Sequence, residues 1–174
     1  MSGTGLLVGC TISSNGYSMG AGIFNSGSLV MVNCTLSGNR NYGSDTTNLT
    51  GSAIANYHSW HFPSASGTTY LNHCTIISNS GPNEIAMRGI FSASNSIIGS
   101  ISGTNNSGGH NLMVDTNGCI ITGDTTGDLY NVAPLLGPLR DNGGRTWTHA
   151  LLPNSPAIDQ TDAIGQPTDQ RGFA

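Results

Sequence analysis

The sequence predicts an all-β protein, a single-stranded parallel β-helix of about four coils over residues 1–104, followed by an irregular module over residues 105–174. Three observations carry this prediction. A short motif recurs every ~22 to 24 residues, the strand-like runs are short, and apolar residues lack the spacing of an amphipathic helix. Repeats of this size bury their apolar faces by stacking, one turn of the coil per repeat. We expect the irregular module to pack on the coil or to cap its end.

The repeated motif joins two strands through a corner. It occurs at residues 9–15, 33–39 and 73–79, and a weaker copy follows at residues 95–98. The alternation of inward and outward positions slips by one residue between Asn33 and Cys34, as a corner requires. Stacking the copies predicts three inward ladders that form the core: Leu7, Met31 and Leu71; Cys10, Cys34, Cys74 and Ser96; and Ile12, Leu36, Ile76 and Ile98.

Two residue types in the repeats are expected to be structural. The cysteines of the second ladder, Cys10, Cys34 and Cys74, are interpreted as small apolar fillers, since three stacked members cannot all form disulfides. An asparagine follows each of them five positions later, and its amide can bond to the amide one coil away. These asparagines are Asn15, Asn39 and Asn79, and Asn25 and Asn56 form a second such pair.

The second repeat is longer than the others, and the excess falls in two loops, residues 40–50 and 57–68. The second loop holds the candidate ligand-binding or subunit-contact residues Tyr57, His58, Trp60, His61 and Phe62. Three interpretations are open: the loop covers the flank of the coil, contacts another subunit, or stacks its aromatic rings on sugars. The spacing of His58 and His61 also suits a metal pair.

Charge and hydropathy exclude several classes of protein. Charged residues make up 8% of the chain, lysine is absent and the net charge is -4, which excludes a basic nucleic-acid-binding surface. No apolar run approaches the roughly 18 to 20 residues that cross a bilayer. Residues 1–5 do not resemble an export signal, so we expect a mature or partial segment of a longer protein.

An ordered series of motifs fills the second half of the chain: GGHNL at residues 108–112, LLGPLRDNGG at 135–144, THALLPNSPAID at 148–159 and TDQRG at 168–172. With the preceding repeats, this series resembles the choice-of-anchor Q domain family of bacterial surface proteins, which are similar in fold to pectin lyases. The resemblance implies a right-handed β-helix and an extracellular or cell-surface location. It also implies a disulfide between Cys119 and a cysteine before GGHNL, but residues 100–107 contain no cysteine.

The pectin-lyase-like fold raises an alternative, a carbohydrate-active protein that is either a polysaccharide lyase or hydrolase or a glycan-binding protein. Glycoside hydrolysis uses two carboxylates about 5 to 10 Å apart, and a lyase uses a base beside a neutralising cation. The repeats contain only Asp45 and Glu84 as acids, both expected in insertions or turns. We therefore expect no catalytic residues and no enzymatic activity, because sites rather than folds carry function.

Most acids lie instead in the irregular module. Asp115, Asp124 and Asp128 are weak candidates for Ca²⁺ ligands. Turns in which each carboxylate binds its own backbone are the favoured interpretation, and no other cofactor is expected. We expect Asp141, Asp169 and Arg171 to be structural, because Arg–carboxylate contacts can hold a segment with few regular hydrogen bonds.

The sequence thus predicts a non-enzymatic extracellular structural or adhesive protein, displayed on a bacterial cell surface or assembled into a surface fibre. The unpaired strand edges at the coil ends predict self-association. A surface polysaccharide is a second candidate partner, and no nucleic-acid partner is expected.

Overall fold

The computed structural model describes residues 3–18, 20–43, 51–56, 67–160 and 166–174, and every regular element in these residues is a β-strand. The strands are β1 (Thr4–Val8), β2 (Thr11–Ser13), β3 (Gly16–Tyr17), β4 (Ile23–Asn25), β5 (Ser28–Val32), β6 (Thr35–Ser37), β7 (Arg40–Asn41), β8 (Gly51–Asn56), β9 (Thr68–Asn72), β10 (Thr75–Ile77), β11 (Asn83–Met87), β12 (Ile90–Ser94), β13 (Ile97–Gly108), β14 (Leu112–Asp115), β15 (Cys119–Asp124) and β16 (Leu129–Tyr130). Within these ranges no helix is long and apolar enough to cross a membrane.

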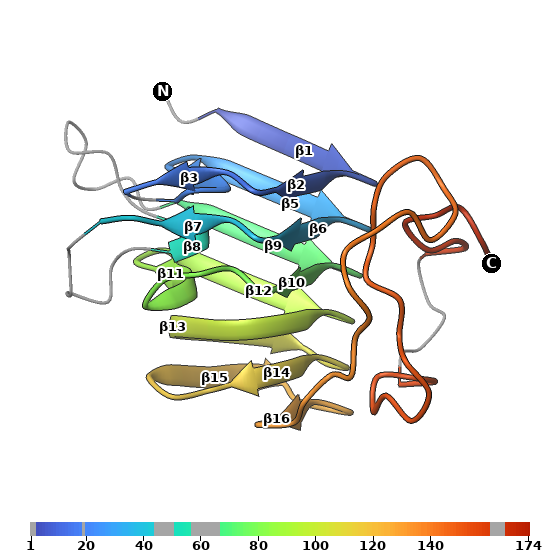
Figure 1. Cartoon of the computed structure of the whole chain (residues 1–174). Coiled ribbons are helices and arrows are strands. Elements are labelled where there is room, and N and C mark those ends of the chain that lie inside the picture. The colour runs from blue at the N-terminus through green and yellow to red at the C-terminus, as the bar shows by residue number, and fades with distance from the viewer. Residues whose placement is uncertain (1–2, 19, 44–50, 57–66, 161–165) are drawn as a thin grey trace.

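The strands pair in parallel, and all except β3 and β7, which pair with each other, form three ladders that stack from β1 to β16 (Figure 1). The first ladder joins β1, β5, β9, β12, the end of β13 and β15. The second joins β2, β6, β10, the start of β13, β14 and β16. The third joins β4, β8, β11 and the middle of β13. The protein is therefore all-β and is dominated by a parallel sheet that curls around its core.

Each pass of the chain adds one rung, and we number the rungs one to six from β2 to β16 along the second ladder. The regular strands thus continue to Tyr130, beyond residue 104, where the sequence placed the boundary. Rungs five and six were not predicted from the repeats because they lack the Cys-Thr-Ile motif. They also have no described strand in the third ladder, so their repeat is shorter.

The strand register confirms two of the predicted inward ladders. Leu7 pairs with Met31, which pairs with Leu71. The second set pairs in the predicted order, Ile12, Leu36, Ile76 and Ile98. Most of these side chains are buried in one apolar cluster, to which the third ladder adds Ile54, Ile85 and Ile101. The core is thus a column of aliphatic side chains that runs the length of the stack.

A second column fills the corner between the first and second ladders. Its members, one per rung, are Cys10, Cys34, Cys74, Ser96, Asn111 and Asp128. The side chains of Cys34, Ser96, Asn111 and Asp128 each accept a hydrogen bond from the backbone N–H of the previous member. Ser96 Oγ, for example, lies 3.1 Å from Cys74 N. The column becomes more polar along the chain, and all four cysteines of the protein are free thiols.

The C-terminal segment comprises residues 131–174, and its described parts, residues 131–160 and 166–174, lie along the outer face of the second ladder instead of across the end of the stack (Figure 1). The segment contacts Gly9 and Thr11 on rung one, Thr35 on rung two and His110 at rung five. The sequence left open whether this module packs on the coil or caps its end. These contacts place it along the flank of the rungs. Polar outward residues on the first rungs provide the hydrogen bonds that hold it there.

Candidate functional site

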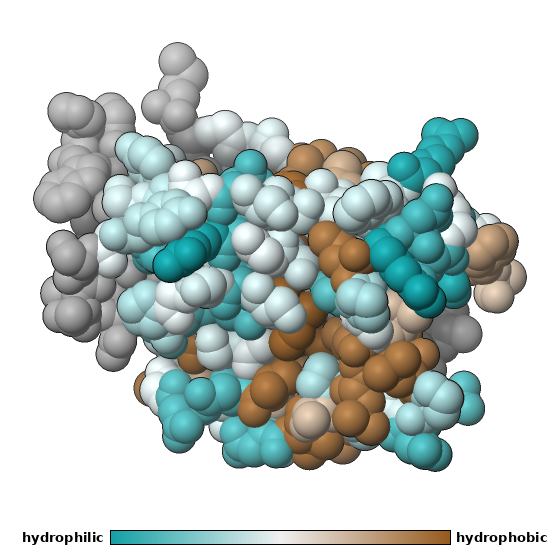
Figure 2. Space-filling model, viewed as in Figure 1, coloured by the Kyte–Doolittle hydropathy of each residue, from teal (hydrophilic) through white to brown (hydrophobic). Residues whose placement is uncertain are grey.

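A groove of about 420 Å³ lies between the outer face of the second ladder and the C-terminal segment. The ladder side is formed by the outward residues of successive rungs: Thr35, Thr75, Ile97, Leu112 and Leu129. The facing side includes Leu136, Ala150, Leu151 and Ala157. On this face of the molecule, apolar residues gather beside the C-terminal segment (Figure 2).

Gln170 attaches the C-terminal segment to the first two rungs. Its Nε2 donates to Thr11 Oγ1 at 3.0 Å, and its Oε1 accepts from Thr35 Oγ1 at 2.7 Å. Thr11 Oγ1 in turn donates to the carbonyl of Trp147 at 2.6 Å. One amide therefore joins two rungs and the segment, because its carbonyl accepts while its NH₂ group donates.

His149 forms a second attachment at rung two. Its Nδ1 lies 2.7 Å from the carbonyl of Gly137, and its Nε2 lies 2.9 Å from Ser37 Oγ. A neutral imidazole with its proton on Nδ1 satisfies both contacts, since Nδ1 donates to the carbonyl and Nε2 accepts from the hydroxyl. His149 therefore has a structural role.

The segment is attached again at rung five, where His110 Nδ1 lies 2.6 Å from the carbonyl of Gln160. Between these attachments, no hydrogen bond among the described residues joins the segment to Thr75 on rung three or Ile97 on rung four. The segment thus bridges these two rungs, and the groove is the space beneath the bridge.

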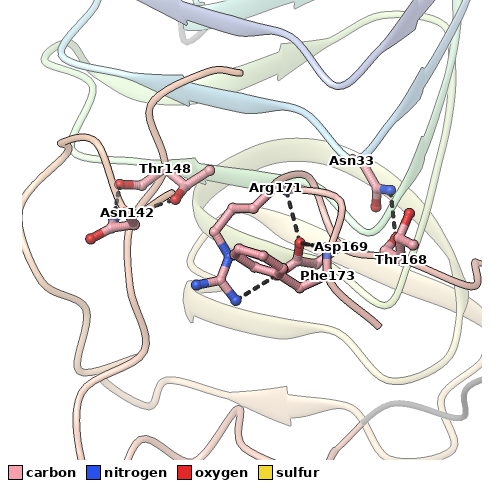
Figure 3. A network of polar contacts seen from close by, with 7 residues as sticks. All are labelled: Asn33, Asn142, Thr148, Thr168, Asp169, Arg171 and Phe173. Carbon is pink, nitrogen blue, oxygen red and sulfur yellow. Dashed lines mark hydrogen bonds and ion pairs between the residues drawn. The ribbon is translucent and has the colours of Figure 1, made fainter. Parts of the chain in front are cut away.

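One wall of the groove is the corner that precedes each rung. Asn33, His73, Asn95 and His110 line it, and all four have positive φ angles between 51° and 57°. Asparagine and histidine are the side chains that adopt this left-handed conformation most readily after glycine. Burial lowers the pKa of His73 below its ordinary value, which favours the neutral imidazole. Asn33 also donates to the carbonyl of Thr168 at 2.9 Å (Figure 3).

Asp169 and Arg171 form a close ion pair at the edge of the groove (Figure 3). Asp169 Oδ2 lies 2.7 Å from Arg171 Nε and 2.6 Å from Nη2, and Oδ1 accepts from the backbone N–H groups of Arg171 and Phe173. Burial alone would raise the pKa of Asp169, but the hydrogen bond from Arg171 lowers it below the ordinary value. The contacts of Asp169 with Arg171 and Phe173 stay within one turn of the C-terminal segment and do not join it to the rungs. Gln170 and His149 attach the segment to the rungs instead.

Asp141 differs from this arrangement, because its Oδ1 closes a local turn by accepting from Gly143 N at 2.9 Å. The neighbouring Arg140 donates to Asn142 Oδ1 at 3.0 Å. Asn142 then donates to the carbonyl of Thr148 at 2.7 Å, which joins the two sides of the loop (Figure 3).

The three candidate Ca²⁺ ligands lie in separate structural contacts. Asp115 and Asp124 each accept from the backbone N–H two residues later, and the contact with Thr126 lowers the pKa of Asp124. Asp128 accepts from the Asn111 backbone and side chain through Oδ1, and from Ser107 and Tyr130 through Oδ2. Among the described residues no group of three metal-ligating side chains occurs.

Glu84 lies in strand β11 and not in a turn, contrary to the sequence expectation. It is buried, which raises its pKa to about 7, and its Oε2 accepts from Asn79 Nδ2 at 2.7 Å. The asparagines stack as a line: Asn15 Nδ2 donates to Asn39 Oδ1 at 3.0 Å, and Asn39 Nδ2 to Asn79 Oδ1 at 2.9 Å. Asn25 and Asn56 are joined in the same way at 2.9 Å. These contacts give the asparagines structural roles.

The candidate residues Tyr57, His58, Trp60, His61 and Phe62 lie outside the described residues. The sequence analysis in turn missed Thr11, Thr35, Thr75 and Gln170, which define the groove and its attachment. A signal for the threonines was available, because each follows a cysteine of the repeat and one-residue alternation turns it outward. No sequence signal pairs Gln170 with them.

Comparison with known proteins found no family model, curated protein or solved structure that matches the chain. The function must therefore be argued from the chemistry of the residues themselves.

Proposed function

We propose that this chain is a right-handed parallel β-helix from an extracellular, surface-displayed bacterial protein with a structural or adhesive role. Stacked parallel rungs support the proposal, because each rung contacts only its neighbours and such a stack makes a stiff, extendable scaffold. Three of the motifs that resemble the choice-of-anchor Q domain family, LLGPLRDNGG, THALLPNSPAID and TDQRG, also lie in the segment that packs along the rungs, where Gln170 and His149 make its attachments.

The position of the acids carries the non-enzymatic part of the proposal. Asp115, Asp124 and Asp141 close turns, Asp128 completes the corner column, and Glu84 is buried in a strand. Among the described residues that line the groove there is a single carboxylate, that of Asp169, and Arg171 binds it. Glycoside hydrolysis uses two carboxylates that flank the substrate, so this groove is better suited to binding than to cleavage.

The two ends of the stack support self-association. Among the described strands, β1 pairs only with β5 and β15 pairs only with β13, so each presents one unpaired edge. Leu6 is 65% exposed at the first end and Ile120 is 64% exposed at the other. Unpaired edges with apolar side chains favour pairing with another chain.

An activity assay tests the non-enzymatic role. The purified chain is incubated with pectin, alginate and β-glucan, with and without Ca²⁺, and new reducing ends and ultraviolet-absorbing unsaturated products are measured. We expect no product above that of an Asp169→Asn variant. Reproducible product that this substitution or Glu84→Gln abolishes would overturn the proposal.

A further inference from the structure

The threonines of the second ladder differ in whether their hydroxyl groups have partners. Thr11, Thr35 and Thr75 occupy the same position on rungs one, two and three. The hydroxyls of Thr11 and Thr35 bond to the C-terminal segment through Gln170 and the carbonyl of Trp147. The hydroxyl of Thr75 has no hydrogen-bond partner among the described residues, although Thr75 lines the groove. The groove therefore offers the polar position that the protein itself fills on the first two rungs.

The described residues that line the groove carry no net charge. Among them, Asp169 and Arg171 are the only Asp, Glu, Lys or Arg side chains, and they neutralise each other. Burial lowers the pKa of His73, which favours the uncharged form of its imidazole. A ligand with a net charge would find no unpaired opposite charge here, whereas an uncharged ligand with hydroxyl groups would meet carboxamides, imidazoles and a hydroxyl.

The floor of the groove beyond Thr75 is aliphatic. Ile97, Leu112 and Leu129 are register partners on rungs four, five and six, and all three line the groove. A pyranose ring has a face of C–H groups that packs on such a surface while its hydroxyls reach the polar wall. The volume of about 420 Å³ also lies within the roughly 300 to 1,000 Å³ typical of small-ligand pockets.

From these observations we propose that the groove binds an uncharged hexose unit of a glycan, with Thr75, His73 and Asn95 as its polar contacts and Ile97 and Leu112 beneath the sugar ring. This inference rests on the adhesive role proposed above and gives it a site and a ligand class. The bound sugar takes the place that Gln170 occupies on rungs one and two.

Calorimetric titration and ligand-observed NMR test this inference with uncharged glucose, galactose and mannose trisaccharides, and with a galacturonate trisaccharide as the charged comparison. We expect at least one uncharged trisaccharide to bind and the galacturonate to bind at least tenfold more weakly. Binding of no uncharged trisaccharide, or equal binding of the galacturonate, would overturn the inference.

Two substitutions locate the ligand. Thr75→Val removes one hydroxyl at nearly constant volume and should weaken binding about threefold to tenfold, the range expected for one neutral hydrogen bond. His73→Asn removes the imidazole that contacts the sugar and should also weaken binding. The variant should keep the fold, because Asn33 and Asn95 occupy the same corner position with similar φ angles. Thr104→Val is the matched control, because Thr104 is exposed on the first ladder, away from the groove. This variant should bind the trisaccharide as the unchanged protein does. Unaltered binding by both groove variants would overturn the inference.

The assembly of the chain separates this inference from the proposed function. Light scattering on the same samples reports self-association without any glycan. Absence of glycan binding in a chain that still associates would refute the glycan site and leave the structural role supported. Glycan binding by a chain that hydrolyses the same glycan would instead refute the non-enzymatic role.

Discussion

Asn79 donates a 2.7 Å hydrogen bond to Glu84, and this contact ends the line of amides that runs from Asn15 through Asn39. On the next rung Gly99 leaves the space that the carboxyl group occupies, because a Cβ there would overlap Glu84 Oε1. A carboxylate suits the end of this line, since it accepts a hydrogen bond and has no N–H that needs a partner. Its burial, however, disfavours the charged form.

The first prediction concerns the pH dependence of this contact. The folded protein raises the pKa of Glu84 from its ordinary value of 4.5 to about 7, so the folded state binds the proton more tightly than the unfolded state. The resulting stabilisation is complete below the unfolded pKa and is lost as pH rises through about 7, at a cost of roughly 3 kcal/mol. Glu84→Gln should therefore melt at a higher temperature than the unchanged protein at pH 8.

Denaturation at pH 5 provides the comparison for this variant. The difference between Glu84→Gln and the unchanged protein should shrink or reverse there, because at pH 5 the carboxyl group of Glu84 is protonated in the folded state and the cost of burying its charge is removed. The lowered pKa of His73 acts in the opposite direction below pH 6.5, so the difference between the two proteins isolates Glu84. An equal difference at pH 5 and pH 8 would show that Glu84 is not the titrating group.

The second prediction concerns the attachment of the C-terminal segment. Gln170→Leu keeps a similar side-chain length but leaves the hydroxyl of Thr35 without its acceptor, so it should reduce the free energy of unfolding by about 1 to 3 kcal/mol. Gln160→Ala is the control, because Gln160 is exposed and meets His110 through its backbone carbonyl. Its effect should stay within about 0.5 kcal/mol. Urea denaturation measures both, and equal effects would contradict the described attachment.

The third prediction concerns Ca²⁺. Asp115 and Asp124 each accept a backbone hydrogen bond within their own turn, and Asp128 accepts through both oxygens, so the three carboxylates do not converge on one ion. We therefore expect neither Ca²⁺ nor a chelator to change the melting temperature by more than about 1 °C. Asp128→Ala should instead destabilise the protein by about 1 to 3 kcal/mol in either condition, because Asn111 and Ser107 lose their acceptor. A large rise in melting temperature on adding Ca²⁺ would show that these carboxylates bind the ion.

The fourth prediction concerns the cysteines. All four are free in the structure, and the neighbouring Cys34 thiol together with burial holds the pKa of Cys74 well above its ordinary value. Thiol titration without reductant should therefore find four reactive groups in denaturant and slow reaction at Cys74 in the folded state. Fewer than four groups in denaturant would demonstrate a disulfide.

Features that recur with the repeats could be predicted from the sequence, and features that do not recur could not. The ladder from Ile12 to Ile98 could be predicted because each member occupies the same place in a visible motif. Asn111 and Asp128 continue the corner column without that motif, so rungs five and six went unrecognised. The groove depends on contacts such as Gln170 with Thr11, which join residues far apart in the sequence. Periodicity within a chain holds no information on such contacts.

We propose that the stack is a structural unit whose ends bind further copies of the chain. Light scattering across a range of concentrations tests it most directly, because the mass of one chain is 17.9 kDa. We predict a mass that rises with concentration, and a smaller rise when Leu6→Lys places a charge beside the open edge of β1. A stable mass of 17.9 kDa at every concentration would contradict the account.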